Sequence, residues 1–439
     1  MLITNNLNYW PGIYLLGKGV SVYVFLVLPL ILIGASAQAA TLEQLVHQAL
    51  KNHPKLAAQQ AIIDAKEVGI ETAEWQYYPT LSASYEAVSA AKSDVSYAGD
   101  TGVTTLRIEQ PLWSGGRLAV GVDLATSKVA LEQIQLQVVQ INIAESVLDA
   151  YGKWVSGYRT MQAWERGLKL HKGLEEQVQN RVNHGVSAPI DLALAQGRVA
   201  STHAQYLAAK SESELALDEI NQLTQFQYTP TELAKHLSAS QPTMVSLNSH
   251  EIWNRALLVD PQIAFAQNEI GLAKLELHEQ EAAINPNVYF RAEQQVNSFS
   301  TAQVGSSMRF FIGISGNSGA GLSLLSQNNG AAAMVLAKQA VLVAIQYTKR
   351  QKLAQLVSKI KSLHYRIDAL ASAMKITLAV SESYSRQFLA GRKTWQEVLN
   401  SAREQVQMEV QIVDLEAAVL VAQWRLALYT LGHRLGGET

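Results

Sequence analysis

The feature that most constrains this chain is an internal repeat. Three landmarks recur in one order at nearly one spacing: Pro54 and Pro261 (261 − 54 = 207), Pro79 and Pro286 (286 − 79 = 207), and Gly185 and Gly391 (391 − 185 = 206). Three agreeing offsets are hard to obtain by chance, and self-similarity at a fixed spacing indicates duplicated structural units. The sequence therefore predicts two copies of one unit.

The repeat divides the chain into four predicted parts: a signal peptide (1–39), a first repeat (40–225), a linker or equatorial segment (226–248) and a second repeat (249–439). The linker is polar and contains Pro230 and Pro242, which is typical of a connection between units. Each repeat is predicted to contain a helix, two strands, a long helix, a turn and a final helix.

The N-terminus has the pattern of a secretory signal. Lys18 precedes an apolar run over residues 20–33, and Ala37-Gln38-Ala39 fits a small-x-small cleavage site. A membrane anchor is the alternative, but this run of about 14 residues is shorter than the roughly 20 that a spanning helix needs. The stretch before Lys18 is long for a signal, so the true start can lie downstream. No other uninterrupted apolar run is long enough to span a bilayer, so a membrane-integral form must use β-strands.

Composition excludes several classes of protein. The 439 residues include no cysteine, which excludes disulfides, zinc thiolate sites, a cysteine nucleophile and a lipoprotein. The net charge of −2 gives no basic surface for nucleic acid. Charged residues make up 16% of the chain, below the roughly 25% of ordinary soluble domains, which indicates much surface covered by protein or lipid.

In the first repeat the expected helices cover residues 42–76, with a break near Pro54, and then 117–183 and 189–225. The second of these lacks proline, which favours a long helix, and 67 residues would extend about 100 Å. Apolar and polar residues alternate over 81–87 and 104–112, which predicts two strands.

In the second repeat, alternation predicts strands around residues 288–293 and 309–314. The glycine-rich stretch 313–330 is ambiguous, and the fourth strand can continue there through Leu322 and Leu324. The apolar side of the strands includes Leu106, Ile108, Val288 and Phe290, which we expect to face lipid.

The strands have about the nine to eleven residues that a tilted membrane strand requires. Aromatic residues gather where strands meet helices, at Trp75, Tyr77, Tyr78 and Trp113, as in the interfacial girdle of a membrane barrel. Ordinary core packing is the alternative. Four strands cannot close a barrel, and the open edges of a sheet cannot face lipid. The chain should therefore oligomerise. About twelve strands from three copies would be the smallest barrel with a wide interior.

The sequence resembles the TolC family of outer-membrane efflux proteins over nearly all of the mature chain. The resemblance rests on the duplication and on these motifs: Asn52-His53-Pro54, Tyr78-Pro79, the segment 110–117 (QPLWSGGR), and Arg181-Val182-Asn183-His184-Gly185 with Asp191. It implies a mainly α fold with membrane β: a homotrimer with four strands per subunit in one barrel and long helices in a periplasmic tunnel. The implied location is the outer membrane of a Gram-negative cell, extending into the periplasm.

The resemblance also implies partners and a function. Family members are not enzymes, use no cofactor, and dock on an inner-membrane transporter through a periplasmic adaptor (membrane fusion) protein. Residues 387–400 are similar to the second-repeat turn of members that serve type I secretion with an ABC transporter, including exporters of large adhesins. Multidrug-efflux members, which work with RND pumps, are often lipoproteins, and this chain has no cysteine. The favoured function is type I protein secretion; the alternatives are multidrug efflux and, in another class, a periplasmic coiled-coil adaptor or structural protein.

One departure from the family concerns the second repeat. The family usually carries a proline and a glycine pair before the last long helix, whereas residues 324–330 (LLSQNNG) stand there in this chain. The bend from strand to helix at this site is therefore less strongly predicted.

The resemblance assigns a pore constriction to Glu397 and Asn400. Both match acidic ring residues at the periplasmic tip of the family, and positions i and i+3 share one helix face. Three copies of Glu397 would form a negative ring, which narrows a pore and favours cations. A solvated helix face is the alternative, and Asn400 makes the second ring neutral.

A periplasmic gate is assigned beside the turns at Gly185 and Gly391. It comprises Asp191, Arg392, Lys393 and Phe388; the last stands where the family has an assisting tyrosine. Equivalent groups in the family link neighbouring helix pairs. Because an exposed ion pair contributes only about 0–1 kcal/mol, such a link is reversible.

Enzymatic sites find little support. The ten histidines are scattered without an HExxH motif or metal-ligand spacing. Residues 316–321 resemble a phosphate-binding loop faintly but lack the following Lys-Ser/Thr. We therefore expect no enzyme, no metal and no cofactor.

Overall fold

The computed structural model describes residues 41–89, 94–235, 249–301, 306–316, 320–321 and 323–432. The expected signal peptide lies outside the described residues. All elements below belong to one unit that begins at Ala39.

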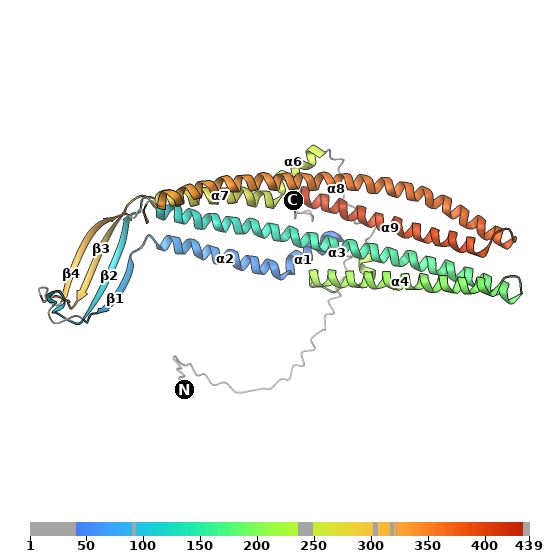
Figure 1. The fold of residues 1–439 in the computed structure, drawn as a ribbon, viewed down its shortest axis with the longest axis horizontal. Coiled ribbons are helices and arrows are strands. Elements are labelled where there is room, and N and C mark those ends of the chain that lie inside the picture. The colour runs from blue at the N-terminus through green and yellow to red at the C-terminus, as the bar shows by residue number, and fades with distance from the viewer. Residues whose placement is uncertain are drawn as a thin grey trace, which may run out of the picture. The chain divides into compact units, whose positions relative to one another are not determined.

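The first repeat contains four main helices and two strands (Figure 1). In chain order they are α1 (Leu42–Asn52), α2 (Pro54–Trp75), β1 (Thr80–Ala87), the short 3-10 helix η1 (Val95–Tyr97), β2 (Gly102–Trp113), α3 (Arg117–Asn183) and α4 (Pro189–Thr224). The break predicted near Pro54 is confirmed: His53 ends α1, and its Nδ1 accepts a hydrogen bond from the backbone N–H of Lys55 to cap α2.

The second repeat reproduces this order after the short helix α5 (Pro230–Ala234). Its elements are α6 (Ser249–Val259), α7 (Pro261–Ala282), β3 (Asn287–Val296), β4 (Ser306–Ser315), α8 (Ser323–Leu389) and α9 (Trp395–Leu431). Both α2 and α7 have 22 residues, and both α3 and α8 have 67, so the predicted duplication is confirmed in the helices themselves.

The prediction that the fourth strand can continue through Leu324 was wrong, because β4 ends at Ser315 and Leu324 lies in the first turn of α8. Leu322 lies outside the described residues. Among the residues that the structure describes, α8 also contains a stretch long and apolar enough to cross a membrane by length and composition alone, although only 6% of that stretch is buried. Isolated polar residues interrupt this stretch, so it does not form an uninterrupted apolar run in the sequence.

The four strands form one antiparallel sheet in the order β1-β2-β3-β4. The central pair, β2 and β3, joins the two repeats, so strands far apart in the sequence lie side by side at one end of the helices (Figure 1). The register shifts between Pro111 and Trp113, where proline offers no N–H to the ladder. Strands β1 and β4 are the edges of the sheet within one chain.

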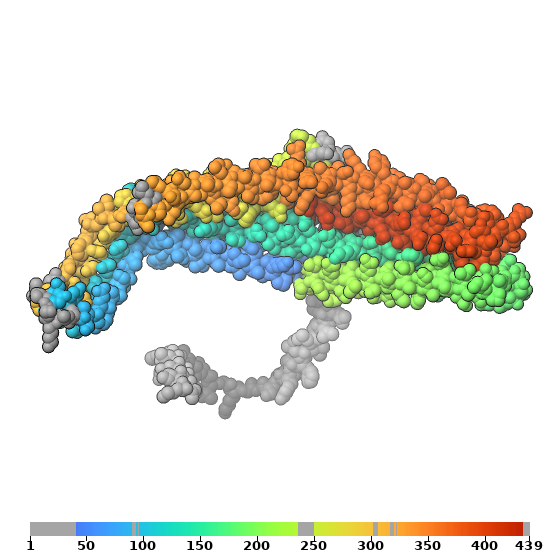
Figure 2. All heavy atoms as spheres, viewed as in Figure 1, coloured from blue at the N-terminus to red at the C-terminus, as the bar shows by residue number. Residues whose placement is uncertain are grey.

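The main hydrophobic cluster lies midway along α3, where α1, α4 and α9 pack against it. Trp154 and Tyr151 are its largest side chains, and both are fully buried. Figure 2 shows α9 of the second repeat lying against α3 and α4 of the first, so the two repeats share this core.

Candidate functional site

The sheet has one apolar face and one polar face. Paired residues share a face, and the register places Leu106 and Ile108 of β2 on the same face as Phe290 of β3 and Ile312 of β4. This apolar face is the more open one, with Ile312 79% exposed. The opposite face carries charged and polar side chains that are more covered. A sheet with these two faces can form part of a membrane barrel whose interior is polar.

The aromatic residues at the strand–helix junctions do not pack into the core of the chain. Trp75 is 67% exposed and Trp113 is 51% exposed, and the rings of Trp75 and Tyr78 contact each other at 5.0 Å between centroids. Tyr77 is exposed as well. These aromatic residues therefore do not form part of the hydrophobic core of one chain. Their role as an interfacial girdle stays a prediction.

The two helical hairpins end in matching turns at the end of the helices away from the sheet (Figure 1). Gly185 and Gly391 have φ values of 71° and 72°, a left-handed conformation that suits glycine. In the first turn the N–H of Val186 donates to the carbonyl of Arg181, and in the second the N–H of Arg392 donates to that of Gln387. These bonds satisfy the last helical carbonyls and reverse the chain.

The two hairpins pack together near these turns through one hydrophobic cluster. It contains side chains from all four helices: Leu174, Val178, Ala195, Phe388, Trp395, Val398, Leu399 and Ala402. The rings of Phe388 and Trp395 lie 4.9 Å apart, and the guanidinium of Arg181 lies 4.7 Å from the centre of the Phe388 ring. Phe388, assigned to the gate from the sequence, therefore lies in the core of the tip.

The predicted ring and gate residues lie close together at the start of α9. Lys393 Nζ contacts Glu397 Oε1 at 2.6 Å and lies 4.5 Å from the centre of the Tyr384 ring. Asn400 and Arg392 are exposed. Asp191 lies in the first turn of α4. The structure describes both Asp191 and Lys393, and no ion pair joins these two residues within one chain. Within one chain, the partner of Lys393 is Glu397.

A second polar contact between the hairpin helices was not found from the sequence. His171 of α3 is buried, and its Nδ1 lies 2.9 Å from the hydroxyl of Thr202 on α4. Because that hydroxyl donates to the carbonyl of Arg198, the imidazole must donate through Nδ1. Burial, with a smaller contribution from the charge of Arg198, lowers the pKa of His171 to about 4. The ring is therefore neutral at ordinary pH and serves packing.

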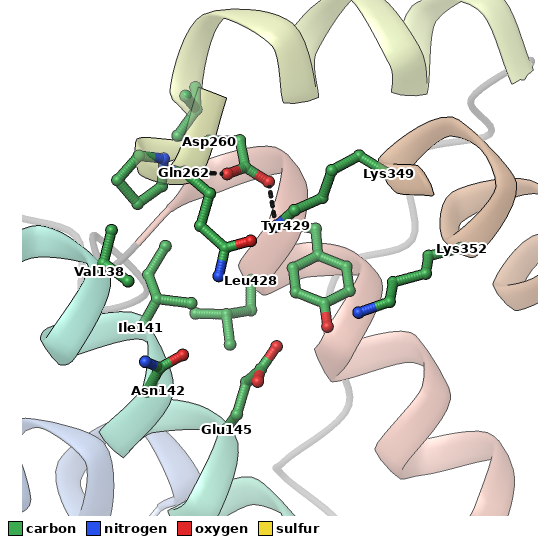
Figure 3. Close-up of a pocket in the computed structure, with 12 residues that line it drawn as sticks. Val138, Ile141, Asn142, Glu145, Asp260, Gln262, Lys349, Lys352, Leu428 and Tyr429 are labelled. Atoms are coloured by element: carbon green, nitrogen blue, oxygen red, sulfur yellow. Dashed lines mark hydrogen bonds and ion pairs between the residues drawn. The ribbon is translucent and has the colours of Figure 1, made fainter. Parts of the chain in front are cut away.

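A buried ion pair joins the start of α7 to α8 (Figure 3). Asp260 accepts a hydrogen bond from the N–H of Gln262, which caps α7, and its other oxygen lies 2.6 Å from Lys349 Nζ. The Lys349 ammonium lies 5.5 Å from the centre of the Tyr429 ring, and burial raises the pKa of Tyr429. These groups line a cavity of about 60 Å³, with room for only a few water molecules, so the arrangement is structural.

Only one residue of this ion pair, Asp260, has a recognisable signal in the sequence. The Asp260-Pro261 pair marks a capped helix start, but nothing local indicates that Lys349, 89 positions later (349 − 260), is its partner. No group of three or more histidine, cysteine or acidic residues in the described part of the chain is arranged to hold a metal ion.

Comparison with known proteins finds relatives in sequence and in fold. Residues 45–224 match the family described as outer membrane efflux protein. The outer membrane efflux protein BepC of Brucella suis biovar 1 (strain 1330) is 21% identical over 412 residues, which cover 90% of this chain and 86% of BepC.

Solved structures with the same fold include the outer membrane protein VceC of Vibrio cholerae, with a TM-score of 0.72 and 17% identity over 89% of this chain and 96% of VceC. The outer-membrane channel OprN matches with a TM-score of 0.74 and 19% identity over 89% of each chain. CusC, whose structures describe transmembrane channel formation, matches with a TM-score of 0.74 and 16% identity over 89% of this chain and 92% of CusC. The mainly helical fold with a four-stranded sheet is thus that of outer-membrane channels.

Proposed function

Because the chain belongs to the TolC family of outer-membrane efflux proteins, with its helices extending from the outer membrane into the periplasm, we propose that three copies of it form one export duct. In this assembly the sheets close a barrel through the membrane, and the helices form a tunnel that receives substrate from an inner-membrane transporter.

The observation that carries this proposal is the two-faced sheet with open edges. In lipid, the unpaired backbone groups of β1 and β4 would each lack partners, which is costly in a medium without water. Pairing β4 of one chain with β1 of the next satisfies both edges, and three such joints close the sheet. The mass of the purified protein in detergent tests this assembly. A stable monomer with an intact fold would contradict it.

We assign the periplasmic tip as the narrow and gated end of this duct. Glu397 and Asn400 form the constriction, and Asp191, Arg392 and Lys393 link neighbouring hairpins. The position of both hairpin turns at the same end supports this assignment, since three copies would converge there. The Lys393–Glu397 contact adds that the negative ring is partly neutralised by a cation of its own chain.

For the substrate, we favour secretion of a protein, such as an adhesin, through a type I system with a periplasmic adaptor and an ABC transporter. The similarity of residues 387–400 to the turn of such members supports this choice, as does the absence of cysteine. A second candidate is multidrug efflux with an RND pump, because BepC is described as an efflux protein. The shared fold removes support for the coiled-coil adaptor alternative.

Crosslinking in cells followed by purification of the chain distinguishes the two candidates. Recovery of an ABC transporter, together with loss of a surface protein from a deletion strain, supports type I secretion. Recovery of an RND pump, together with increased drug sensitivity of the same strain, supports multidrug efflux and would replace the favoured substrate.

A further inference from the structure

Helices α4 and α8 are the outer two of the four helices that run to the hairpin turns. In this part of the chain α3 packs against α4 and α9, and α9 packs against α8, so the order across the chain is α4, α3, α9, α8 (Figure 1). When copies stand side by side in a ring, α8 of one copy therefore meets α4 of the next. Among the described residues of one chain, no ion pair joins α4 to α8.

The number of residues between a position and its hairpin turn gives the height of that position on the helix. α4 starts just after the first turn and α8 ends just before the second, at the same end of the molecule (Figure 1). The count agrees with observed ion pairs. Lys153 and Glu219 pair, and both lie 30 residues from the first turn (183 − 153, 219 − 189). Arg166 and Glu409 pair between hairpins at counts of 17 and 14 (183 − 166, 409 − 395). Equal counts therefore mean equal heights to within one helical turn.

Opposite charges on α4 and α8 lie at equal heights. Lys210 lies 21 residues after the start of α4 (210 − 189), and Asp368 lies 21 residues before the end of α8 (389 − 368). Glu212 and Arg366 both lie at a count of 23 (212 − 189, 389 − 366). All four residues are exposed. Within the described chain, Lys210 has one ionic contact, at 3.8 Å to Glu214 of its own helix, and the other three residues form no ion pair.

The two pairs lie on opposite flanks of their helices. Glu219 and Lys359 border one groove of the chain. Glu212 and Arg366 each lie seven residues, or about two turns, from these groove residues, so this pair lies on the groove side. The other pair is two residues away, and residues two apart on a helix do not share a face. A ring turns the grooves of all copies to the same side, so each charge lies on the same flank as its counterpart.

Large apolar side chains are exposed between these flanks. Leu215 of α4 is 68% exposed at a count of 26 (215 − 189), and Tyr365 of α8 is 75% exposed at a count of 24 (389 − 365). Leu207 of α4 and Ile376 of α8 are exposed as well. A neighbouring copy would remove this apolar surface from water, which favours association.

We propose that α4 of one copy and α8 of the next form the periplasmic joint of the trimer, in which Lys210 faces Asp368 and Glu212 faces Arg366. This inference rests on the proposed duct of three copies. The turns align the two helices only to within one turn, and the charges then select the register. A slip of two residues brings like charges level, Lys210 with Arg366 in one direction and Glu212 with Asp368 in the other, which is unfavourable. The joint is therefore specific for a second copy of this chain in one register.

Because the chain has no cysteine, engineered cysteines report on this joint directly. In membrane vesicles treated with a short bis-maleimide, Leu215→Cys combined with Tyr365→Cys should give covalent dimers and trimers on a denaturing gel. The matched control combines Leu215→Cys with Leu336→Cys, which changes another exposed leucine of α8, 29 residues (365 − 336) and about 44 Å before Tyr365. This control should run as a monomer.

The mass of the uncrosslinked protein separates the two proposals. Equal crosslinking of both double variants, or no crosslinking of the first, in a preparation that is trimeric by mass would overturn the joint and leave the duct intact. A preparation that is monomeric by mass would instead contradict the duct.

Charge reversal in the same assay tests the register. At low ionic strength, Asp368→Lys added to the first cysteine pair should slow crosslinking about tenfold, because all three joints lose an ion pair and gain a like-charge contact with Lys210. Adding Lys210→Glu as well should restore the rate. The matched control is Glu67→Lys, the same charge change at an exposed site on α2, which should leave the rate unchanged. Equal slowing by the control, or no restoration by Lys210→Glu, would overturn the pairing.

Discussion

Lys393 and Glu397 form an ion pair across the first turn of α9, with Lys393 Nζ 2.6 Å from Glu397 Oε1. The other carboxylate oxygen accepts hydrogen bonds from the N–H and the hydroxyl of Thr394, both at 2.9 Å, and the Thr394 hydroxyl accepts the N–H of Glu397. This capping box gives Glu397 a second task besides the proposed ring: it begins the helix.

The first prediction concerns the pH dependence of ion selectivity. The bond from Lys393, followed by the bonds from Thr394, lowers the pKa of Glu397 to about 2. Because the folded-state pKa lies below the ordinary 4.5, the ionised carboxylate stabilises the tip fully above pH 4.5 and loses this contribution as pH falls towards 2. We expect cation preference, measured as reversal potential in a salt gradient, to persist at pH 4 and to disappear towards pH 2.

The matched variants for this experiment are Glu397→Gln and Lys393→Met. Glutamine can still complete a capping box but carries no charge, so Glu397→Gln should show weak selectivity without this titration. Lys393→Met removes the largest cause of the lowered pKa and should move the transition to higher pH. Wild-type selectivity that is independent of Glu397 would place the constriction elsewhere.

The second prediction concerns gating. Replacing Lys393 with Glu puts two like charges four residues apart and removes the proposed cationic link between hairpins. We expect higher single-channel conductance in planar bilayers from Lys393→Glu. The control is Lys361→Glu, the same charge change at an exposed site on α8. If both variants conduct like wild type, the gate does not involve Lys393.

The third prediction concerns the packing of α3 against α4. A Cβ atom at Gly157 would lie 3.0 Å from the backbone nitrogen of Ser213, which cannot move away easily. We expect Gly157→Ala to destabilise the folded protein by about 1–3 kcal/mol. At Gly173 on the same helix a Cβ atom meets nothing within 4 Å, so Gly173→Ala should be neutral or stabilising by up to about 1 kcal/mol. Thermal unfolding followed by circular dichroism compares the two, and equal melting temperatures would show that α3 and α4 are more loosely packed.

The fourth prediction concerns the face of the sheet that meets lipid. Phe290 lies on the apolar face opposite Ile312, and Arg291 lies on the polar face opposite Phe311. An arginine in place of Phe290 should cost about 2–4 kcal/mol near the bilayer midplane, so Phe290→Arg should assemble poorly in vesicles. Arg291→Leu should assemble better than Phe290→Arg. The reverse order of assembly would show that the face assignment is inverted.

Several elements could be predicted from the sequence because their signals are local. The proline that starts α2, the glycine after α3 and the alternation along β2 each act within a few residues, and the repeat carries each signal over to α7, α8 and β4. The start of α8 at Ser323 was not predictable in the same way. The glycine-rich stretch before it has no strong cap or period, so strand and helix were equally compatible with it.

The candidate site could likewise be predicted from the sequence only in part. The turn glycines and the position of Glu397 follow from motifs along the chain, whereas the burial of Phe388 beneath Arg181 depends on how two hairpins meet. Within one chain, Lys393 pairs with Glu397, four residues further along, and its predicted link to another hairpin stays a prediction.

By itself, the sequence determined that this chain contains two copies of one helix–strand–strand–helix unit and that each strand has one apolar side, because duplication and periodicity are properties of neighbouring residues. Only the tertiary structure decided that β2 pairs with β3, that Arg107 meets Glu293, and that Asp260 meets Lys349. These contacts join residues from different repeats or different helices. Their free energy depends on burial and distance in space, which no local pattern in the chain records.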